Sequence, residues 1–323
     1  MTAATHATAA PSVEEFSVTR RPLTFDPGVY PDVKDPCLVH DGDTWHLYGT
    51  GCNAHGKGGP LEILHAVSPR LGGPWQQLDP VRLDRDLGGE AAAPGVVAAD
   101  GELHLFVQTA WSKLGGTIEH FASDDGRAFR WVDTALTSRR RGPERGIYDP
   151  HPCEIDGESY LAYSGMNVVG RPDVFLARSR TGLWSGPWER LGCIVGHADV
   201  DCHNQFDDPD YEWGLEGGQI VELADGRVLF NAVCFLRDHP AGTKQRMFFA
   251  VADEVLGPYD VIGAAIEPIG GPTAGENGHG CVVIDRGRVH VVFQERRAPD
   301  WHWRYARAGL SVVARSQSLE LAG

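Results

Sequence analysis

The chain has 323 residues, including 40 glycines and 21 prolines, and its formal net charge is −15. This acidic balance argues against nucleic acid or an anionic membrane as partner, because phosphate contacts need clustered Lys and Arg. We find no apolar run long enough to span a membrane. The length allows a large core, and the glycine and proline content is typical of a turn-rich all-β protein.

Residues 1–25 are predicted to form a disordered arm, and residues 26–323 a single domain. Residues 1–12 are small and polar and have no apolar core of a signal peptide, so we expect a cytoplasmic protein. The seven cysteines lack the close pairing of a zinc site, and free thiols fit a reducing compartment. Cys37, Cys153 and Cys281 are predicted to occupy matching strand positions as small buried residues.

One pattern recurs five times: a polar or small residue at a strand start, a short apolar strand, a turn and a second strand. The five copies begin at Asp35, Ala93, Asp149, Glu216 and His279, with spacings of 58, 56, 67 and 63 residues. The turn is often Asp-Gly, which favours a hairpin because both residues tolerate the positive φ that it needs. A repeat of this size built from short strands predicts propeller blades.

The second half of each unit repeats as well. Three units contain a strand followed by Gly-Pro-aromatic, at 73–75, 186–188 and 257–259. Proline suits the outer edge strand of a blade, because an edge strand loses little when one hydrogen-bond donor is missing. We therefore predict an all-β fold, a five-bladed β-propeller of four-stranded antiparallel blades.

In a propeller the innermost strand of each blade lines the central channel. The first residues of the repeats would then meet at one mouth of the channel, and they include the carboxyls of Asp35, Asp149 and Glu216 and the imidazole of His279. A glycosidase needs one carboxylate to deprotonate water and one protonated carboxyl to donate to the leaving oxygen. A third carboxylate beside the acid raises its pKa by like-charge repulsion.

Four motifs in register resemble those of glycoside hydrolase family 43, the arabinanase, arabinofuranosidase and xylosidase group, and its relatives. They are Lys34-Asp35-Pro36, Tyr148-Asp149-Pro150, Leu215-Glu216-Gly217 and Gly278-His279-Gly280. The resemblance covers nearly the whole chain in order and spacing. It implies a five-bladed propeller hydrolase that acts on a furanoside or a pentose-containing oligosaccharide.

Carried over residue by residue, the resemblance makes Asp35 the general base, Asp149 the group that orients and tunes the acid, and Glu216 the general acid. The family inverts configuration, so the carboxyls of Asp35 and Glu216 are expected about 6.5–9.5 Å apart. A plainer reading also exists: each Asp-Pro pair merely starts a strand, and the carboxylate caps a turn.

Three roles stay open for His279: neighbour of a metal ion, hydrogen-bonding partner of a sugar, or a histidine satisfied within the channel. The resemblance implies that a calcium or sodium ion can lie beside it. Calcium prefers oxygen ligands, so a single His would imply an ion coordinated mostly by water. No cofactor is required for the predicted chemistry.

Further substrate contacts are predicted from loops near the channel mouth. The acidic segment 197–213 would form a wall of the pocket, with His203 or Trp213 touching sugar; a metal loop and a solvated acidic loop are the alternatives. Trp111 is placed to stack on a sugar ring or to pack at a blade rim. His151 and Asn167 are weaker candidates from the third unit.

Three other interpretations remain. A propeller phosphorylase would need a basic cluster to hold phosphate, to which Arg296 and Arg297 would contribute. A retaining relative would bring its carboxyls to about 5–5.5 Å, but Lys34 stands where the retaining sucrose-cleaving relatives have Asn. From a different class, a non-catalytic propeller would bind carbohydrate without turnover. The sequence predicts an oligosaccharide as partner and leaves the oligomeric state open.

Overall fold

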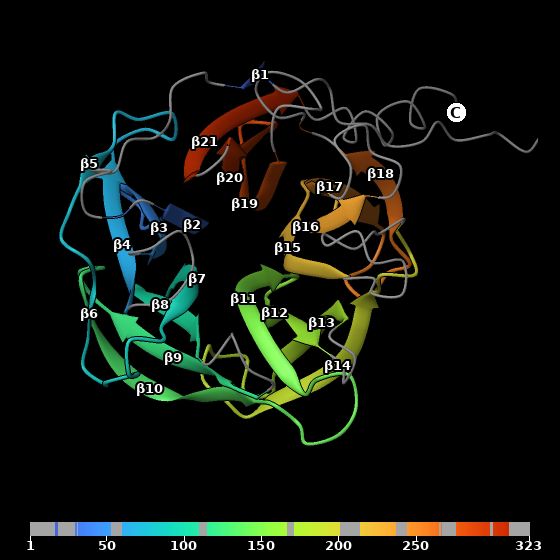
Figure 1. Cartoon of the computed structure of the whole chain (residues 1–323), viewed down its shortest axis with the longest axis horizontal. Helices are drawn as coiled ribbons and strands as arrows, with labels where there is room; N and C mark the ends of the chain where they lie inside the picture. Colours follow the sequence, from blue (N-terminus) through green and yellow to red (C-terminus); the bar gives the residue numbers. More distant parts are fainter. Residues whose placement is uncertain are drawn as a thin grey trace, which may run out of the picture.

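The structure is a computed structural model. It describes residues 17–18, 30, 32–52, 60–109, 115–166, 171–200, 214–236, 244–264, 266, 276–297 and 300–309. These residues form strands and turns grouped into five sheets, which stand around a central axis like the blades of a propeller (Figure 1). Within the described residues, no helix is long and apolar enough to cross a membrane. The predicted five-bladed, all-β fold is confirmed.

The strands follow one another outward in each blade. Blade one contains β2 (Asp32–His40), β3 (Trp45–Cys52), β4 (Leu61–Ser68) and β5 (Gln76–Gln77), and blade two contains β7 (Ala92–Ala99), β8 (Glu102–Gln108), β9 (Thr117–Ser123), β10 (Ala128–Thr137) and β6 (Arg82–Leu83). Blade three contains β11 (Gly146–Ile155), β12 (Glu158–Met166), β13 (Pro172–Ser179) and β14 (Trp188–Val195). Blade four contains β15 (Leu215–Glu222), β16 (Val228–Leu236), β17 (Lys244–Ala252) and β18 (Asp260–Ala264). Blade five contains β19 (Glu276–Asp285), β20 (Arg288–Arg297), β21 (Asp300–Gly309) and β1 (Ser17–Val18).

Two blades differ from four consecutive antiparallel strands. In blade two a fifth strand, β6, pairs with β10 in parallel. In blade five the outermost strand is β1, where Ser17 pairs with Arg307. Ser17 and Val18 lie inside the segment expected to be a disordered arm, and the remainder of residues 1–25 lies outside the described residues. The N-terminal strand therefore completes the last blade.

Two of the four Asp-Gly turns that follow an inner strand have positive φ at both residues, whereas at residues 41–42 and 225–226 only the glycine does. Asp100 and Gly101 have φ of 53° and 83°, and Asp156 and Gly157 have φ of 51° and 72°, so both residues of these hairpin turns are left-handed. Such φ values match the right-handed twist of the strands that the turns join. The three Gly-Pro-aromatic motifs lead into the outer strands β5, β14 and β18.

The inner strands form a closed ring. Each of β2, β7, β11, β15 and β19 contacts the next, and β19 contacts β2 again. Among the described residues, the hydrophobic core forms four clusters of buried side chains, and each cluster contains residues from adjacent blades. Phe106, Leu161 and Phe230 are fully buried there, and burying one such side chain stabilises the fold by about 1.5–3 kcal/mol. The blades therefore hold one another in place.

Buried cysteines connect neighbouring inner strands. The Sγ atom of Cys37 accepts the Val96 N–H at 3.2 Å, and that of Cys281 accepts the Leu38 N–H at 3.1 Å. The prediction that Cys153 matches them is wrong: His151 is the first residue paired after the register shift of β11, as Cys37 is in β2, and Cys153 lies two residues further along. None of the six described cysteines forms a disulfide.

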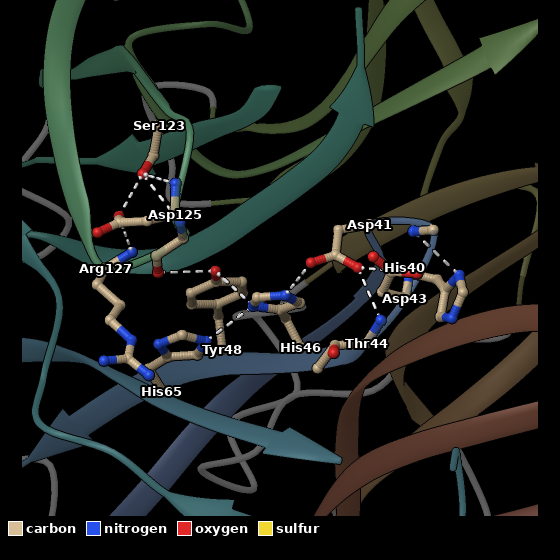
Figure 2. A network of polar contacts seen from close by, with 12 residues as sticks. His40, Asp41, Asp43, Thr44, His46, Tyr48, His65, Ser123, Asp125 and Arg127 are labelled. Atoms are coloured by element: carbon tan, nitrogen blue, oxygen red, sulfur yellow. Dashed lines mark hydrogen bonds and ion pairs between the residues drawn. The ribbon is translucent and has the colours of Figure 1, made fainter. Parts of the chain in front are cut away.

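A polar network crosses the core of blade one (Figure 2). The Nε2 atom of His46 lies 2.8 Å from Oδ2 of Asp41, and its Nδ1 lies 3.0 Å from Nε2 of His65. The Tyr48 hydroxyl donates to the Gly126 carbonyl of blade two at 2.9 Å. Burial lowers the pKa of His65 to about 3, so its imidazole is neutral. The network ties the β2–β3 hairpin to β4 and to the next blade.

Candidate active site

The residues of the predicted site lie on irregular turns of the inner strands. The pairing of every inner strand with its neighbour shifts register near the first residue of the repeat. Asp35 and Asp149 are each the fourth residue of their strand rather than its start, and their φ values are 51° and 50°. A bulge of this kind turns a side chain away from its regular direction. Here it places the carboxyls at the channel.

Glu216 does not occupy the same register position as the two aspartates, so this part of the predicted alignment is wrong. The left-handed residue of β15 is Gly217, with φ of 64°. Glu216 is the last residue paired before the register shift, where blades one and three carry Lys34 and Tyr148. A glutamate is one methylene longer than an aspartate, and this side chain still reaches the other acids.

The imidazole of His279 joins the three acids. Its Nδ1 lies 2.9 Å from Oδ1 of Asp35, and its Nε2 lies 3.3 Å from Oε1 of Glu216 and 3.8 Å from Oδ2 of Asp149. These four side chains are 8–16% exposed. Three carboxyls from blades one, three and four therefore surround one imidazole from blade five, as the repeat predicted.

Asp149 and Glu216 are linked through the backbone of blade four. Oδ2 of Asp149 accepts the Gly217 N–H at 3.1 Å and the Ser164 hydroxyl at 3.3 Å, and that hydroxyl also accepts the Gly217 N–H. Oε1 of Glu216 accepts the side-chain amide of Gln245 at 3.2 Å. The sequence reading missed Ser164 and Gln245, which lie on the second strand of blade three and the third strand of blade four.

The pKa of each group depends on its neighbours. Burial alone would lower the pKa of His279, but Asp149, Asp35 and Glu216 raise it well above its usual value, so the imidazole is a cation at neutral pH. Burial would raise the pKa of Asp35, but hydrogen bonding and attraction to His279 lower it. Burial and repulsion from Glu216 and Asp35 outweigh the attraction to His279 and raise the pKa of Asp149 to about 7. Asp35 is thus ionised, whereas Asp149 holds a proton up to neutral pH.

A cation could also be held here. One ligand atom each of Asp149, Glu216 and His279 lies within 4.8 Å of the others. Two carboxylates and water would suit Ca²⁺, which prefers oxygen ligands. A metal can bind only a deprotonated imidazole nitrogen, whereas His279 is protonated between the acids. The donor set therefore fits an ion that replaces this proton.

A cavity of about 40 Å³ lies at the centre of the ring and is lined by Asp35, Asp149, His151 and His279 among others. A cavity of this size holds a water molecule or an ion. Burial lowers the pKa of His151 to about 3, so the channel wall presents a neutral imidazole. The other predicted substrate contacts, Trp111, Asn167, His203 and Trp213, lie outside the described residues, as does residue range 201–213 of the acidic segment.

Solved structures with the same fold include arabinanases and arabinofuranosidases. An endo-arabinase from Bacteroides thetaiotaomicron aligns with a TM-score of 0.65 and 16% identity over 90% of this chain and 96% of its own. An α-L-arabinofuranosidase from Podospora anserina, solved with cellotriose, gives 0.63 and 13% over 93% and 98%. An α-L-arabinanase from Cellvibrio cellulosa, solved with arabinohexaose, gives 0.58 and 19% over 85% and 91%.

At these identities the likeness establishes the fold of the chain. No model of a known protein family matches the sequence, and no curated protein matches it either.

Proposed function

We propose that this protein is a glycoside hydrolase that acts on arabinose-containing oligosaccharides with inversion of configuration. The observation that supports it best is that three carboxyls lie close to one imidazole. These groups belong to residues 35, 149, 216 and 279, which come from four different blades. Separate ionised and protonated carboxyls are what glycoside hydrolysis requires. The fold shared with arabinanases and arabinofuranosidases is consistent with this substrate class.

In this proposal Asp35 is the general base, because His279 keeps its carboxyl ionised. It removes a proton from a water molecule, whose oxygen attacks the anomeric carbon. Glu216 gives a proton to the departing glycosidic oxygen, so each bond that breaks is matched by one that forms. Asp149, protonated up to neutral pH and within 4.8 Å of Glu216, can supply that proton to the acid.

Other elements of the proposal rest on the sequence. Trp111, Asn167, His203 and Trp213 are proposed to contact the sugar, and His151 to line the channel beneath it. No cofactor takes part in bond cleavage, and any Ca²⁺ or Na⁺ would lie beside His279. We propose a cytoplasmic location, with which cysteines that form no disulfide are compatible, and short oligosaccharides are then more suitable substrates than polymers.

The test is hydrolysis of a panel of nitrophenyl glycosides and arabino-oligosaccharides, with the anomer of the product followed by NMR during the first turnovers. We expect inverted product from the wild type, and loss of about 10³-fold or more in kcat for Asp35→Asn with unchanged folding. Retained configuration would contradict inversion. Turnover that requires phosphate would identify a phosphorylase, and glycan binding without turnover would identify a binding propeller.

A further inference from the structure

Polar side chains on the second strands hold the bulges of the following blades. Thr50 accepts the Ala93 N–H at 2.8 Å, and Gln108 accepts the Asp149 N–H at 2.6 Å. Across the closure of the ring, Gln294 of blade five accepts the Asp35 N–H at 2.8 Å. Each contact fixes the backbone of one bulge from the blade before it.

Ser164 of blade three acts in the same way on blade four, because its hydroxyl accepts the Gly217 N–H. Blade four then departs from the pattern. In blade four, the residue that pairs with Glu216 just before the register shift is Val233. This side chain is fully buried and apolar, so it cannot hydrogen-bond the backbone of blade five. The amide near this junction comes instead from Gln245 on the third strand, β17.

Gly278 leaves the space into which Gln245 extends. A Cβ atom on this glycine would lie 2.7 Å from Oε1 of Gln245 and 3.3 Å from Nε2 of Gln294. The first distance is shorter than a Cβ contact tolerates, so a side chain here would displace the Gln245 amide. Gly278 therefore lies between two buried glutamines, of which one contacts Glu216 and the other fixes Asp35.

The side chains of Gln245 and His279 both lie within hydrogen-bonding distance of the same oxygen of Glu216, Oε1. The Gln245 amide lies 3.2 Å from Oε1, and Nε2 of the His279 imidazolium lies 3.3 Å from that atom. An oxygen that accepts two N–H groups is a poor position for an acidic proton, since a carboxylic O–H must itself find an acceptor. Within the described residues, Oε2 takes no such donor.

We propose that Gln245 is a positioning residue that reserves Oε1 of Glu216 as an acceptor and so places the catalytic proton on Oε2, facing the leaving group. Gln294 is its counterpart for the base, because it fixes the backbone from which Asp35 extends. This inference rests on the proposed hydrolase function, in which Glu216 is the acid. If the proposal holds, Gln245 affects protonation of the leaving group, whereas Gln294 affects activation of the attacking water.

The test compares two leaving groups. An activated aryl group leaves with little protonation, whereas a sugar leaving group depends on the acid, whose contribution is typically about 10²–10⁴-fold. Gln245→Met keeps the length of the side chain and removes its amide. We expect kcat/KM to fall about 10–100-fold on arabinobiose and less than about 3-fold on the nitrophenyl arabinoside. Gln294→Met should lower both rates by similar factors, because water attack is common to both substrates.

Asn231→Ala is the matched control. It removes another buried amide of blade four, which donates to the Gly280 carbonyl at 3.1 Å instead of to a carboxyl, and it should leave the ratio of the two rates unchanged. If Gln245→Met does not fold, Gly278→Ala tests the same contact by displacing the amide. We again expect a larger loss of kcat/KM on arabinobiose than on the nitrophenyl arabinoside, but with a smaller difference between the two substrates.

The outcomes separate the two claims. Equal loss on both substrates in Gln245→Met or Gly278→Ala would overturn the assignment of Gln245 while the hydrolase function stood. A wild-type protein that cleaves neither substrate would overturn the hydrolase function itself, and with it this assignment.

Discussion

The Nδ1 atom of His279 lies 2.9 Å from Oδ1 of Asp35, which joins the last inner strand of the ring to the first. The same imidazole faces Glu216 and Asp149 through Nε2. One cation therefore lies among three buried carboxyls, and it offsets the cost of burying the negative charge of Asp35. The stability of this site and its chemistry depend on the same contacts.

His279→Gln keeps a polar side chain of similar size and removes the positive charge. Removing one partner of a buried ion pair typically costs about 3–5 kcal/mol, because the remaining charge has no compensation. The raised pKa of His279 means that its contribution is fully present below about pH 6.5 and is lost as the pH rises through the higher folded-state pKa. Urea unfolding at about pH 6.5 should show this loss.

The control is His40→Gln, because His40 is the exposed last residue of the inner strand β2. It should change the free energy of unfolding by less than about 0.5 kcal/mol. Equal effects of the two substitutions would mean that His279 does not compensate the acids.

Asp149→Asn should flatten the dependence of stability on pH. The pKa of Asp149 is raised from 3.8 to about 7 in the folded protein. The stability associated with its proton is therefore fully present below about pH 4 and is lost as the pH rises through 7, by an amount on the order of 4 kcal/mol at most. An amide does not titrate. The measurement is the free energy of unfolding at several pH values between 4 and 8. If it changes with pH by the same amount in the variant and the wild type, Asp149 does not cause the pH dependence.

Ser164→Ala removes the hydroxyl shared by Asp149 and the Gly217 N–H. Loss of a donor to the carboxylate should raise the pKa of Asp149 further, and the free energy of unfolding should fall by about 1–2 kcal/mol. In the pH–rate profile, the limb governed by Asp149 should move to higher pH.

Ser159→Ala is the comparison on the same strand. Its hydroxyl donates to the Gly182 carbonyl at 3.4 Å, far along β12 from the acids. We expect a small stability change and no movement of the pH profile. A shift of equal size in both variants would show that Ser164 affects the site only through general stability.

Calcium should compete with the proton on His279. Because a metal needs the neutral imidazole, the rise in melting temperature with excess CaCl₂ should be larger at about pH 9 than at about pH 6. Glu216→Gln replaces one of the three ligands by a neutral amide oxygen, and loss of that negative charge should diminish the rise. An identical rise at both pH values, or one that persists in the variant, would place any calcium elsewhere.

Several residues of the site carried a signal that a repeat alignment can detect. Thr50, Gln108, Ser164 and Gln294 each lie 15 residues after the first residue of their repeat, in strands that are otherwise mostly apolar. Their polarity has a reason, since each binds the bulge of the following blade. The fifth residue at this spacing, Asn231, does not occupy the equivalent position in its strand. The reason is that Glu216 lies one residue before the bulge of β15, whereas Asp35 and Asp149 lie within the bulges of their strands.

Gln245 had no such signal. It lies on the third strand of its blade, far along the chain from the first residue of the repeat, and its contact with Glu216 depends on the absence of a side chain at Gly278 in the next blade. Neither spacing nor residue type reveals a contact of this kind.

The sequence alone determined the blades, because turn chemistry and strand alternation are local properties that repeat along the chain. It also indicated which acids share a channel, since the first residue of each repeat follows the symmetry of the fold. Only the tertiary structure decided which atoms meet: the bulges, the one-residue offset of Glu216 and the packing between blades set hydrogen bonds at a scale finer than any repeat. In the proposal made above, those contacts decide which carboxyl oxygen carries the catalytic proton.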